Sequence, residues 1–448
     1  MGKPLNRNYM IKKKISQLEF ISLMASLMAL SSLSIDALLP GLKDIAGTIG
    51  ISNPQDNQLL ITMIFMGLGF GQLISGTLSD SLGRKPAVCL GYLVFALASL
   101  VCVFATSLEM IIIGRLLQGF GLSAPRSISI AIIRDKYSGN YMAKVMSFVS
   151  VIFILAPIVA PSLGKLLLDS FGWQSIFYSQ VIYGAGVITW LWQRQPETLK
   201  EEDKKPVRLS LFIDGTKEFF KHKQAVIYTF AIGISTAPFL AYISASQQIF
   251  QVQYGLTEMY PYIFSGLAIT IGLATYLNGT FVVRFGMLKM VTTALITLFV
   301  AAGCYILLFA GKSNPSSFVL IFFLGMMLFS TGFIMGNMNA LAMQPVGHIA
   351  GIGAAIVGFI STIITVPLAT IIGRFIDATA LPIFIGFMVS GALSFILIQT
   401  AKSSAKNTTV SGTGMSSPSA TDIGKGSDTG MGSAADEQLE VAPAFIND

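Results

Sequence analysis

The chain has 448 residues, of which 53% are hydrophobic and only 11% are Asp, Glu, Lys or Arg. A soluble globular protein carries about 25% charged residues, so this composition excludes a large soluble domain and predicts a membrane protein. The net charge of +7 does not indicate nucleic-acid binding, because basic residues collect on the cytoplasmic loops of membrane proteins. The three cysteines lie inside apolar runs without metal-ligand spacing, which predicts small core residues.

Twelve apolar stretches are long enough to cross a bilayer as helices, each of which takes about 20 residues. The first follows three lysines, lacks a small-residue cleavage site and is followed by further spans, so it is predicted to be a retained helix and not a signal peptide. The predicted spans are residues 17–39, 57–78, 86–107, 110–132, 144–167, 173–193, 224–250, 259–283, 288–310, 316–343, 350–373 and 380–400.

The basic residues predict the orientation of these spans. Of the 29 Lys and Arg residues, 23 fall on the side of the N-terminus, 4 fall on the other side, and 2 lie within a span. Because cytoplasmic loops carry the excess of basic residues, both termini are predicted to be cytoplasmic. We therefore expect a multi-pass membrane protein, in contact with the lipid bilayer, with an even number of spans.

One long polar connection divides the chain into two sets of six spans. The expected parts are a cytoplasmic N-terminus (1–16), an N-terminal bundle (17–193), a linker (194–223), a C-terminal bundle (224–400) and a tail (401–448). Apolar residues at helical spacing from Leu209 to Phe220 predict an amphipathic helix on the cytoplasmic membrane face. The tail is rich in Gly, Ser, Thr and Ala and is predicted to be disordered, with a regulatory role as the alternative.

The two halves share a short, partial sequence repeat. Gly76 corresponds to Gly279 and Gly83 corresponds to Gly286, both at an offset of 203 residues. This offset is about half of the predicted membrane region, which indicates a duplicated six-helix unit. Val283 stands where the first copy has Asp80.

Three sequence stretches resemble motifs of the major facilitator superfamily. The loop after span two contains Gly76, Asp80, Gly83, Arg84 and Lys85, and resembles the cytoplasmic signature of that family. Span four, with Arg115-Leu-Leu-Gln-Gly and then Arg134-Asp135, resembles the signature of its drug/proton antiporters. Span five, with Pro157, Pro161 and Gly164, resembles the antiporter motif in the double-proline form of the Bcr/CflA branch.

The resemblance implies the major facilitator fold, an all-α membrane protein with twelve transmembrane helices in two six-helix halves. It also implies a monomer in the bacterial inner (plasma) membrane. It implies that the 76–86 loop is a latch that favours the outward-facing state, whereas a topological anchor is the simpler alternative. The prolines of span five permit bending, as a rocking helix needs, although tight packing between the halves would also explain them.

Three charged residues, Asp36, Arg115 and Arg126, fall inside predicted spans. Each costs about 2.5–3.5 kcal/mol at the centre of a membrane helix, so each should face a wet cavity or another charge. Arg115 and Arg126 are eleven residues apart, which places them on one helix face about 16 Å apart. Only the Asp can lose its proton, so Asp36 is the predicted proton carrier, with capping of span one as the alternative.

These charges suggest separate roles in transport. Arg115, the arginine of the span-four motif, is expected to tune nearby acids in proton coupling. Arg126 is expected to be a counter-charge, either for an anionic group of the substrate or for Asp36. The C-terminal half offers neutral polar side chains for the same cavity, which suits lipophilic drugs; they are Tyr242, Gln247, Asn337 and Asn339.

The sequence therefore predicts proton-coupled efflux of drug-like or lipophilic small molecules by alternating access, driven by the proton gradient without a cofactor or metal. The alternative within the same class is a proton-coupled transporter of a single metabolite. A distant alternative is an intramembrane enzyme or sensor. The chain has two histidines, both predicted to be cytoplasmic, and neither HExxH nor GxSxG, so an enzyme is not expected.

Overall fold

The computed structural model describes residues 15–51, 53–204 and 209–412, which contain helices and no strand. The N-terminal set of long helices is α1 (Gln17–Asp36), α3 (Leu59–Leu82), α4 (Arg84–Val103), α5 (Leu108–Lys136), α6 (Gly139–Phe171) and α7 (Gln174–Arg194). The C-terminal set is α9 (Lys223–Gln247), α10 (Tyr260–Phe285), α11 (Met287–Phe309), α12 (Ser317–Met343), α13 (Ala350–Arg374) and α14 (Leu381–Gly412).

Eleven helices in the described part of the chain are long and apolar enough to cross a membrane, and they match eleven of the twelve predicted spans. The predicted sixth span is α7, a helix of 21 residues. Its glutamines, tyrosines and glycines lower its hydropathy, while its length still suits a bilayer of about 30 Å. The all-α fold is therefore confirmed, and the twelve long helices are consistent with twelve spans.

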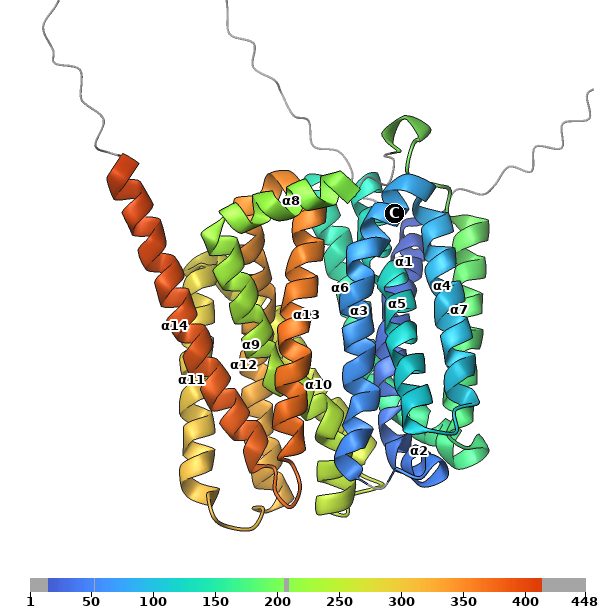
Figure 1. The fold of residues 1–448 in the computed structure, drawn as a ribbon, viewed down its shortest axis with the longest axis vertical. Coiled ribbons are helices and arrows are strands. Elements are labelled where there is room, and N and C mark those ends of the chain that lie inside the picture. Colours follow the sequence, from blue (N-terminus) through green and yellow to red (C-terminus); the bar gives the residue numbers. More distant parts are fainter. Residues whose placement is uncertain (1–14, 52, 205–208, 413–448) are drawn as a thin grey trace, which may run out of the picture. The chain divides into compact units, whose positions relative to one another are not determined.

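Shorter helices connect the long ones. They are η1 (Leu39–Gly41), α2 (Leu42–Ile49), η2 (Pro54–Gln58), η3 (Glu201–Asp203), α8 (Leu209–Lys221), η4 (Gln248–Gln253, a π-helix) and η5 (Gln344–Ile349). In Figure 1, α8 lies at one end of the long helices and α2 at the other, and we call these the α8 end and the α2 end. The helix predicted from Leu209 to Phe220 is thus present, as α8.

One glycine pair of the predicted repeat forms the same turn in both halves. Gly83 ends α3 and precedes α4 with φ +105°, and Gly286 ends α10 and precedes α11 with φ +82°. A positive φ is strained for any residue with a Cβ, so glycine is needed at both positions. The shared offset in the sequence therefore corresponds to the same helix–turn–helix geometry in each half.

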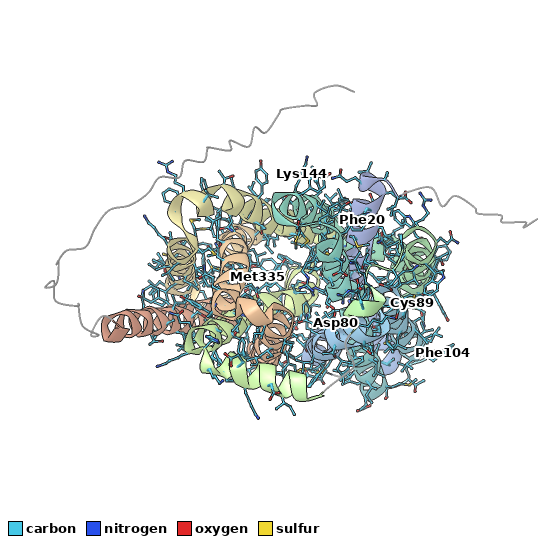
Figure 2. All side chains as sticks on the ribbon, turned by 90° about the horizontal axis from the view of Figure 1, so that it is seen from above. Phe20, Asp80, Cys89, Phe104, Lys144 and Met335 are labelled. Carbon is cyan, nitrogen blue, oxygen red and sulfur yellow. The ribbon has the colours of Figure 1, made fainter. Side chains whose placement is uncertain are left out.

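The described residues up to Ala405 form one compact unit to which both sets of helices belong. Within the N-terminal set, α5 packs against α3, α4 and α1, and within the C-terminal set, α9 packs against α12 and α13. Contacts of α3 with α13 and of α6 with α10 join the two sets. Figure 2 looks along the helices from the α8 end, with Asp80 among the N-terminal helices and Met335 on α12 of the C-terminal set.

Two helix ends and one short helix differ from the prediction. Helix α14 continues to Gly412, beyond the expected end at residue 400, because residues 401–411 contain no proline or glycine. Helix α6 begins at Gly139, earlier than the expected 144. Helix α2 was not predicted, since its eight residues are too few to span a membrane. Residues 413–448, most of the predicted disordered tail, and 1–14 lie outside the described residues.

Candidate functional site

At the α2 end, two buried glutamines join the N-terminal and C-terminal helices. Gln58 of η2 donates through Nε2 to Gln248 Oε1 at 3.0 Å and to the Gly373 carbonyl at 3.2 Å. Gln248 in turn donates to the Ile376 carbonyl at 2.8 Å. Both glutamines are almost fully buried, 4% and 6% exposed. We call Gln58 and Gln248 the amide clasp, because neutral hydrogen bonds alone hold this contact between the halves.

Two ion pairs lie at the same end of the molecule. Arg374 Nη1 lies 2.6 Å from Asp56 Oδ1, and Lys165 Nζ lies 3.2 Å from Glu258 Oε1. Each pair crosses between the two sets of helices, although Glu258 is exposed. Exposed ion pairs contribute only about 0–1 kcal/mol each. The α2 end is therefore closed by polar contacts that are individually weak enough to break.

At mid-depth the halves approach closely through glycine. A Cβ added at Gly69 of α3 would collide with Thr362 of α13, and one added at Gly358 of α13 would collide with Gln72 of α3. Glycine removes the side chain that would keep two helices apart, as in other membrane helix pairs. Helices α3 and α13 are thus in close contact at mid-depth.

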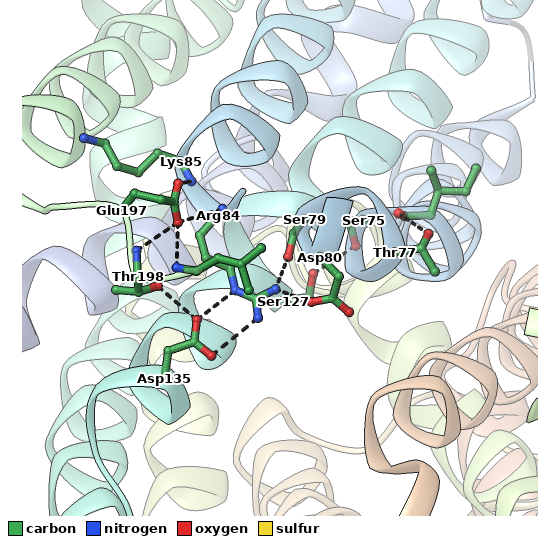
Figure 3. Close-up of polar contacts among 12 residues, drawn as sticks. Ser75, Thr77, Ser79, Asp80, Arg84, Lys85, Ser127, Asp135, Glu197 and Thr198 are labelled. Atoms are coloured by element: carbon green, nitrogen blue, oxygen red, sulfur yellow. Dashed lines mark hydrogen bonds and ion pairs between the residues drawn. The ribbon is translucent and has the colours of Figure 1, made fainter. Parts of the chain in front are cut away.

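At the α8 end, Arg84 organises the motif of residues 76–86 (Figure 3). The structure does not form the loop predicted there: α3 continues to Leu82, Gly83 makes the turn and α4 begins at Arg84. We keep the name 76–86 loop for this motif. Its guanidinium donates to Ser79 Oγ, to Asp80 Oδ1 and, at 2.8 Å, to Asp135 Oδ2. Arg84 is 4% exposed, while the side chain of Asp80 is 46% exposed. These partners all belong to the N-terminal half, so in this conformation Asp80 engages its own loop.

A second acid supports the same loop. Glu197, just after α7, accepts hydrogen bonds from the backbone N–H groups of Arg84 and Lys85, both at 3.0 Å (Figure 3). Lys85 Nζ also donates to the Trp192 carbonyl at 3.0 Å. The first helical N–H groups have no intrahelical acceptors, so Glu197 satisfies the start of α4. The sequence did not indicate Glu197, because nothing in its surroundings distinguishes it from a solvated linker acid. Gly76 of the same motif has open space around it.

Arg115 of α5 is fully buried and holds three acceptors. Its Nε donates to the Leu60 carbonyl at 2.7 Å, and its Nη1 donates to the Ser34 carbonyl at 3.0 Å and to Gln118 Oε1 at 2.9 Å. Gln118 continues to Ser99 Oγ at 2.7 Å. Arg115 therefore links α1, α3 and α5, and through Gln118 also α4. Backbone carbonyls carry no sequence signal, which is why only the burial of Arg115 was predictable.

Asp36 is the last residue of α1 and is 6% exposed. Within the described chain, no Lys or Arg pairs with its carboxylate and no donor hydrogen-bonds to it. It interacts electrostatically with Tyr242 and Tyr260 of the other half, and the Tyr242 hydroxyl is itself buried without a partner. Asp36 thus lies at the interface between the halves, two residues from the carbonyl that Arg115 binds.

The other neutral residues predicted for the cavity bond to partners other than Asp36. Gln247 bonds to Gln251 Oε1 at 2.8 Å, and Asn337 bonds to Asn278 Oδ1 at 2.7 Å, which ties α12 to α10. Asn339 is exposed and donates to the Met335 carbonyl of its own helix. Of the neutral residues singled out in the C-terminal half, Tyr242 is the one that the structure brings near Asp36.

The proline motif lies inside one continuous helix. Pro157 and Pro161 both fall within α6, and a Cβ added at Gly164 would collide with the backbone of Ala37. Close packing against the end of α1 is thus visible at Gly164. No group of three His, Cys, Asp or Glu side chains in the described residues could hold a metal ion.

Comparison with known proteins places this arrangement in context. The model of the Major Facilitator Superfamily matches residues 24–365. A bicyclomycin resistance protein homolog of Haemophilus influenzae is 30% identical over 367 residues, 81% of this chain and 91% of that protein. The multidrug resistance protein MdtL of Salmonella paratyphi A is 28% identical over 387 residues, 83% of this chain and 92% of that protein.

Two solved structures show the same fold. A D-xylose-proton symporter has a TM-score of 0.65 at 14% identity, over 86% of this chain and 97% of that one. The human organic anion transporter MFSD10 has a TM-score of 0.58 at 17% identity, over 85% of this chain and 99% of that one. At these identities the likeness concerns the fold alone.

Proposed function

We propose that this chain exports drug-like, lipophilic small molecules in exchange for protons. The premise is that the chain belongs to the Major Facilitator Superfamily and to its Bcr/CflA-type drug/proton antiporter branch. The chain is a multi-pass membrane transporter and not an enzyme. The proposal adds the bacterial inner membrane, a cytoplasmic α8 end and a cycle of alternating access that needs no cofactor.

The observation that carries the proposal is the unpaired carboxylate of Asp36 at the interface between the halves. A buried ionised carboxylate without a partner is costly, so a bound proton or a bound substrate group must compensate it when water is excluded. Such a group suits exchange, because it takes a proton from one side and releases it as the substrate binds from the other. Asp36 is thus the proposed proton carrier, and Arg115 fixes the helices around it.

The contacts between the halves support an alternating cycle. In the described conformation the α2 end is held by the amide clasp and two ion pairs, while Asp80 of the loop at the α8 end engages its own half. To expose the site on the α2 side, the clasp must break, and Asp80 becomes available as a latch to the C-terminal half. Inward movement of a proton supplies about 2.3 kcal/mol per 100 mV for each charge.

The direct test is transport in inverted inner-membrane vesicles that contain the full chain. Energised vesicles with the wild type should accumulate a lipophilic dye, and a protonophore should stop the accumulation. Vesicles that accumulate no dye, but take up one metabolite in exchange for protons or release one preloaded metabolite together with protons, would replace drug efflux by the transport of a single metabolite. Equal accumulation with and without the protonophore would reject proton coupling.

A further inference from the structure

Arg126 lies on a face of α5 that points between two neighbouring helices. The next residue, Ser127, shares a hydrogen bond of 2.9 Å with Ser75 of α3, and Ser123 packs against Gly71 of α3. Arg115, which reaches α1 through the Ser34 carbonyl, lies eleven residues earlier on nearly the same face. Arg126 therefore sits between the α3 side and the α1 side of α5, away from Ile113, which is 55% exposed on the opposite face.

Exposure along this face rises toward the α8 end. Leu122 is fully buried, Arg126 is partly exposed and Ile130 is 39% exposed. Arg134, one turn later, is exposed near the end of α5. These residues follow one another at four-residue spacing, and their exposure increases toward the α8 end. The increase indicates that a ligand reaches the guanidinium of Arg126 from the α8 end, whereas Arg115 is fully buried.

Arg126 is the arginine without a polar partner in the interior of the described helices. Its guanidinium makes no hydrogen bond or ion pair with any described residue. The acidic residues toward the α8 end form ion pairs with other arginines. Asp80 and Asp135 pair with Arg84, and Glu19 pairs with Arg194 at 2.6 Å. Asp36 lies two residues from the carbonyl that Arg115 binds, about 16 Å along the helix from Arg126, so it is too distant to be the counter-charge in this conformation.

We propose that Arg126 binds the anionic group of the substrate, so that the transported class includes amphipathic organic anions with a carboxylate or sulfonate on a lipophilic body. This inference rests on the proposed function of the same cavity. The planar guanidinium matches the two oxygens of such a group with parallel hydrogen bonds. The apolar side chain of Ile130 lies one turn toward the α8 end, is 39% exposed and suits the lipophilic body.

The test uses 1-pyrenebutyrate and its methyl ester, which share a lipophilic fluorophore and differ in one negative charge. Binding to the purified full chain is measured by fluorescence anisotropy for the wild type and for Arg126→Gln, Arg126→Lys and the control Arg134→Gln. The control removes a positive charge two turns away on the same helix. Coincident thermal unfolding of the four proteins serves as the check on folding.

Wild type is expected to bind the carboxylate at least tenfold more tightly than the ester, as one charge-assisted bidentate contact provides. Arg126→Gln should lose this preference through weaker carboxylate binding, with ester binding unchanged within twofold. Arg126→Lys should retain part of the preference, and Arg134→Gln all of it. If Arg126→Gln unfolds, Arg126→Lys provides the test. A reduced preference of Arg126→Lys for the carboxylate over the ester, with unchanged ester binding, supports the inference.

Two results would overturn the inference and leave drug efflux standing. One is a wild type that binds the two probes equally, and the other is an Arg126 variant that weakens both probes to the same extent. A wild type that transports neutral or cationic dyes in vesicles but binds no anion likewise rejects only the anion site. A wild type that transports no lipophilic compound of any charge rejects the proposed function itself.

Discussion

At the scale of single residues, the buried charges have unlike environments. Arg115 donates to two backbone carbonyls and an amide oxygen, while its Nη2 is buried without a partner. Asp36 and Arg126 make no hydrogen bond or ion pair through their side chains with any described residue. Their location inside spans was predictable from hydropathy and spacing. The difference between them was not, because the acceptors of Arg115 are carbonyl groups that every residue carries. The three hydrogen bonds of Arg115 stabilise the fold by linking helices, whereas the unpaired charges of Asp36 and Arg126 remain available for a ligand.

We expect Arg115→Lys to lower the stability of the protein. A lysine keeps the charge but cannot bond Leu60, Ser34 and Gln118 with one planar group, and each lost charge-assisted bond costs about 1.5–3 kcal/mol. Thermal unfolding in detergent measures the effect, with the exposed Arg134→Lys as the control on the same helix. Unchanged unfolding of Arg115→Lys together with lost proton coupling would show that Arg115 acts mainly on the chemistry.

A pair of glycines offers a second test of packing. Alanine at Gly164 would place its Cβ against the backbone of Ala37, whereas alanine at Gly186 of α7 meets open space. Both changes gain up to about 1 kcal/mol of helix propensity, so their difference isolates the collision. Gly164→Ala should lower the unfolding temperature and Gly186→Ala should not. Equal unfolding temperatures would show that α1 and α6 separate without cost.

At the scale of elements, apolar length predicted the long helices well, and glycine pairs at one offset predicted the repeated turn. Hydropathy did not predict α2, which is short, or the π-helix η4, which follows α9 without a break in the apolar pattern. The contact between the halves at Gln58 and Gln248 joins two short helices, η2 and η4. These residues are 190 positions apart, so a single sequence does not predict that they pair.

We expect Gln58→Leu to loosen the α2 end. Leucine preserves the volume of the buried side chain but removes its bonds to Gln248 and Gly373, leaving two buried acceptors to seek other donors. The measurement is the rate at which a maleimide labels Thr62→Cys, a fully buried position one turn along α3, with the natural cysteines replaced by alanine. Labelling should be several-fold faster than in the parent.

The matched control is Gln55→Leu on the same short helix. Gln55 makes longer contacts of 3.5 Å to Ile376 and Asp377 and is only partly buried. It should leave the labelling of Thr62→Cys unchanged. If Gln55→Leu and Gln58→Leu accelerate labelling equally, the closure of the α2 end is a property of the whole surface and not of the amide clasp.

At the scale of the whole molecule, two related sets of helices meet through contacts of different kinds. Polar groups join them at the α2 end, and closely packed glycines join α3 to α13 at mid-depth. The motifs of the sequence indicated the family and the loop of Arg84, because those residues act within one half. The sequence did not indicate the present conformation, which depends on contacts between halves that form and break as a unit.

The central claim is that Asp36 exchanges a proton for the substrate. The most direct measurement is the release of protons from the purified, detergent-solubilised chain in weak buffer when an exported dye is added. The wild type should release protons, Asp36→Asn should release none, and Asp44→Asn, which alters an exposed acid on α2, should behave as the wild type. Proton release from Asp36→Asn equal to that of the wild type would contradict the claim.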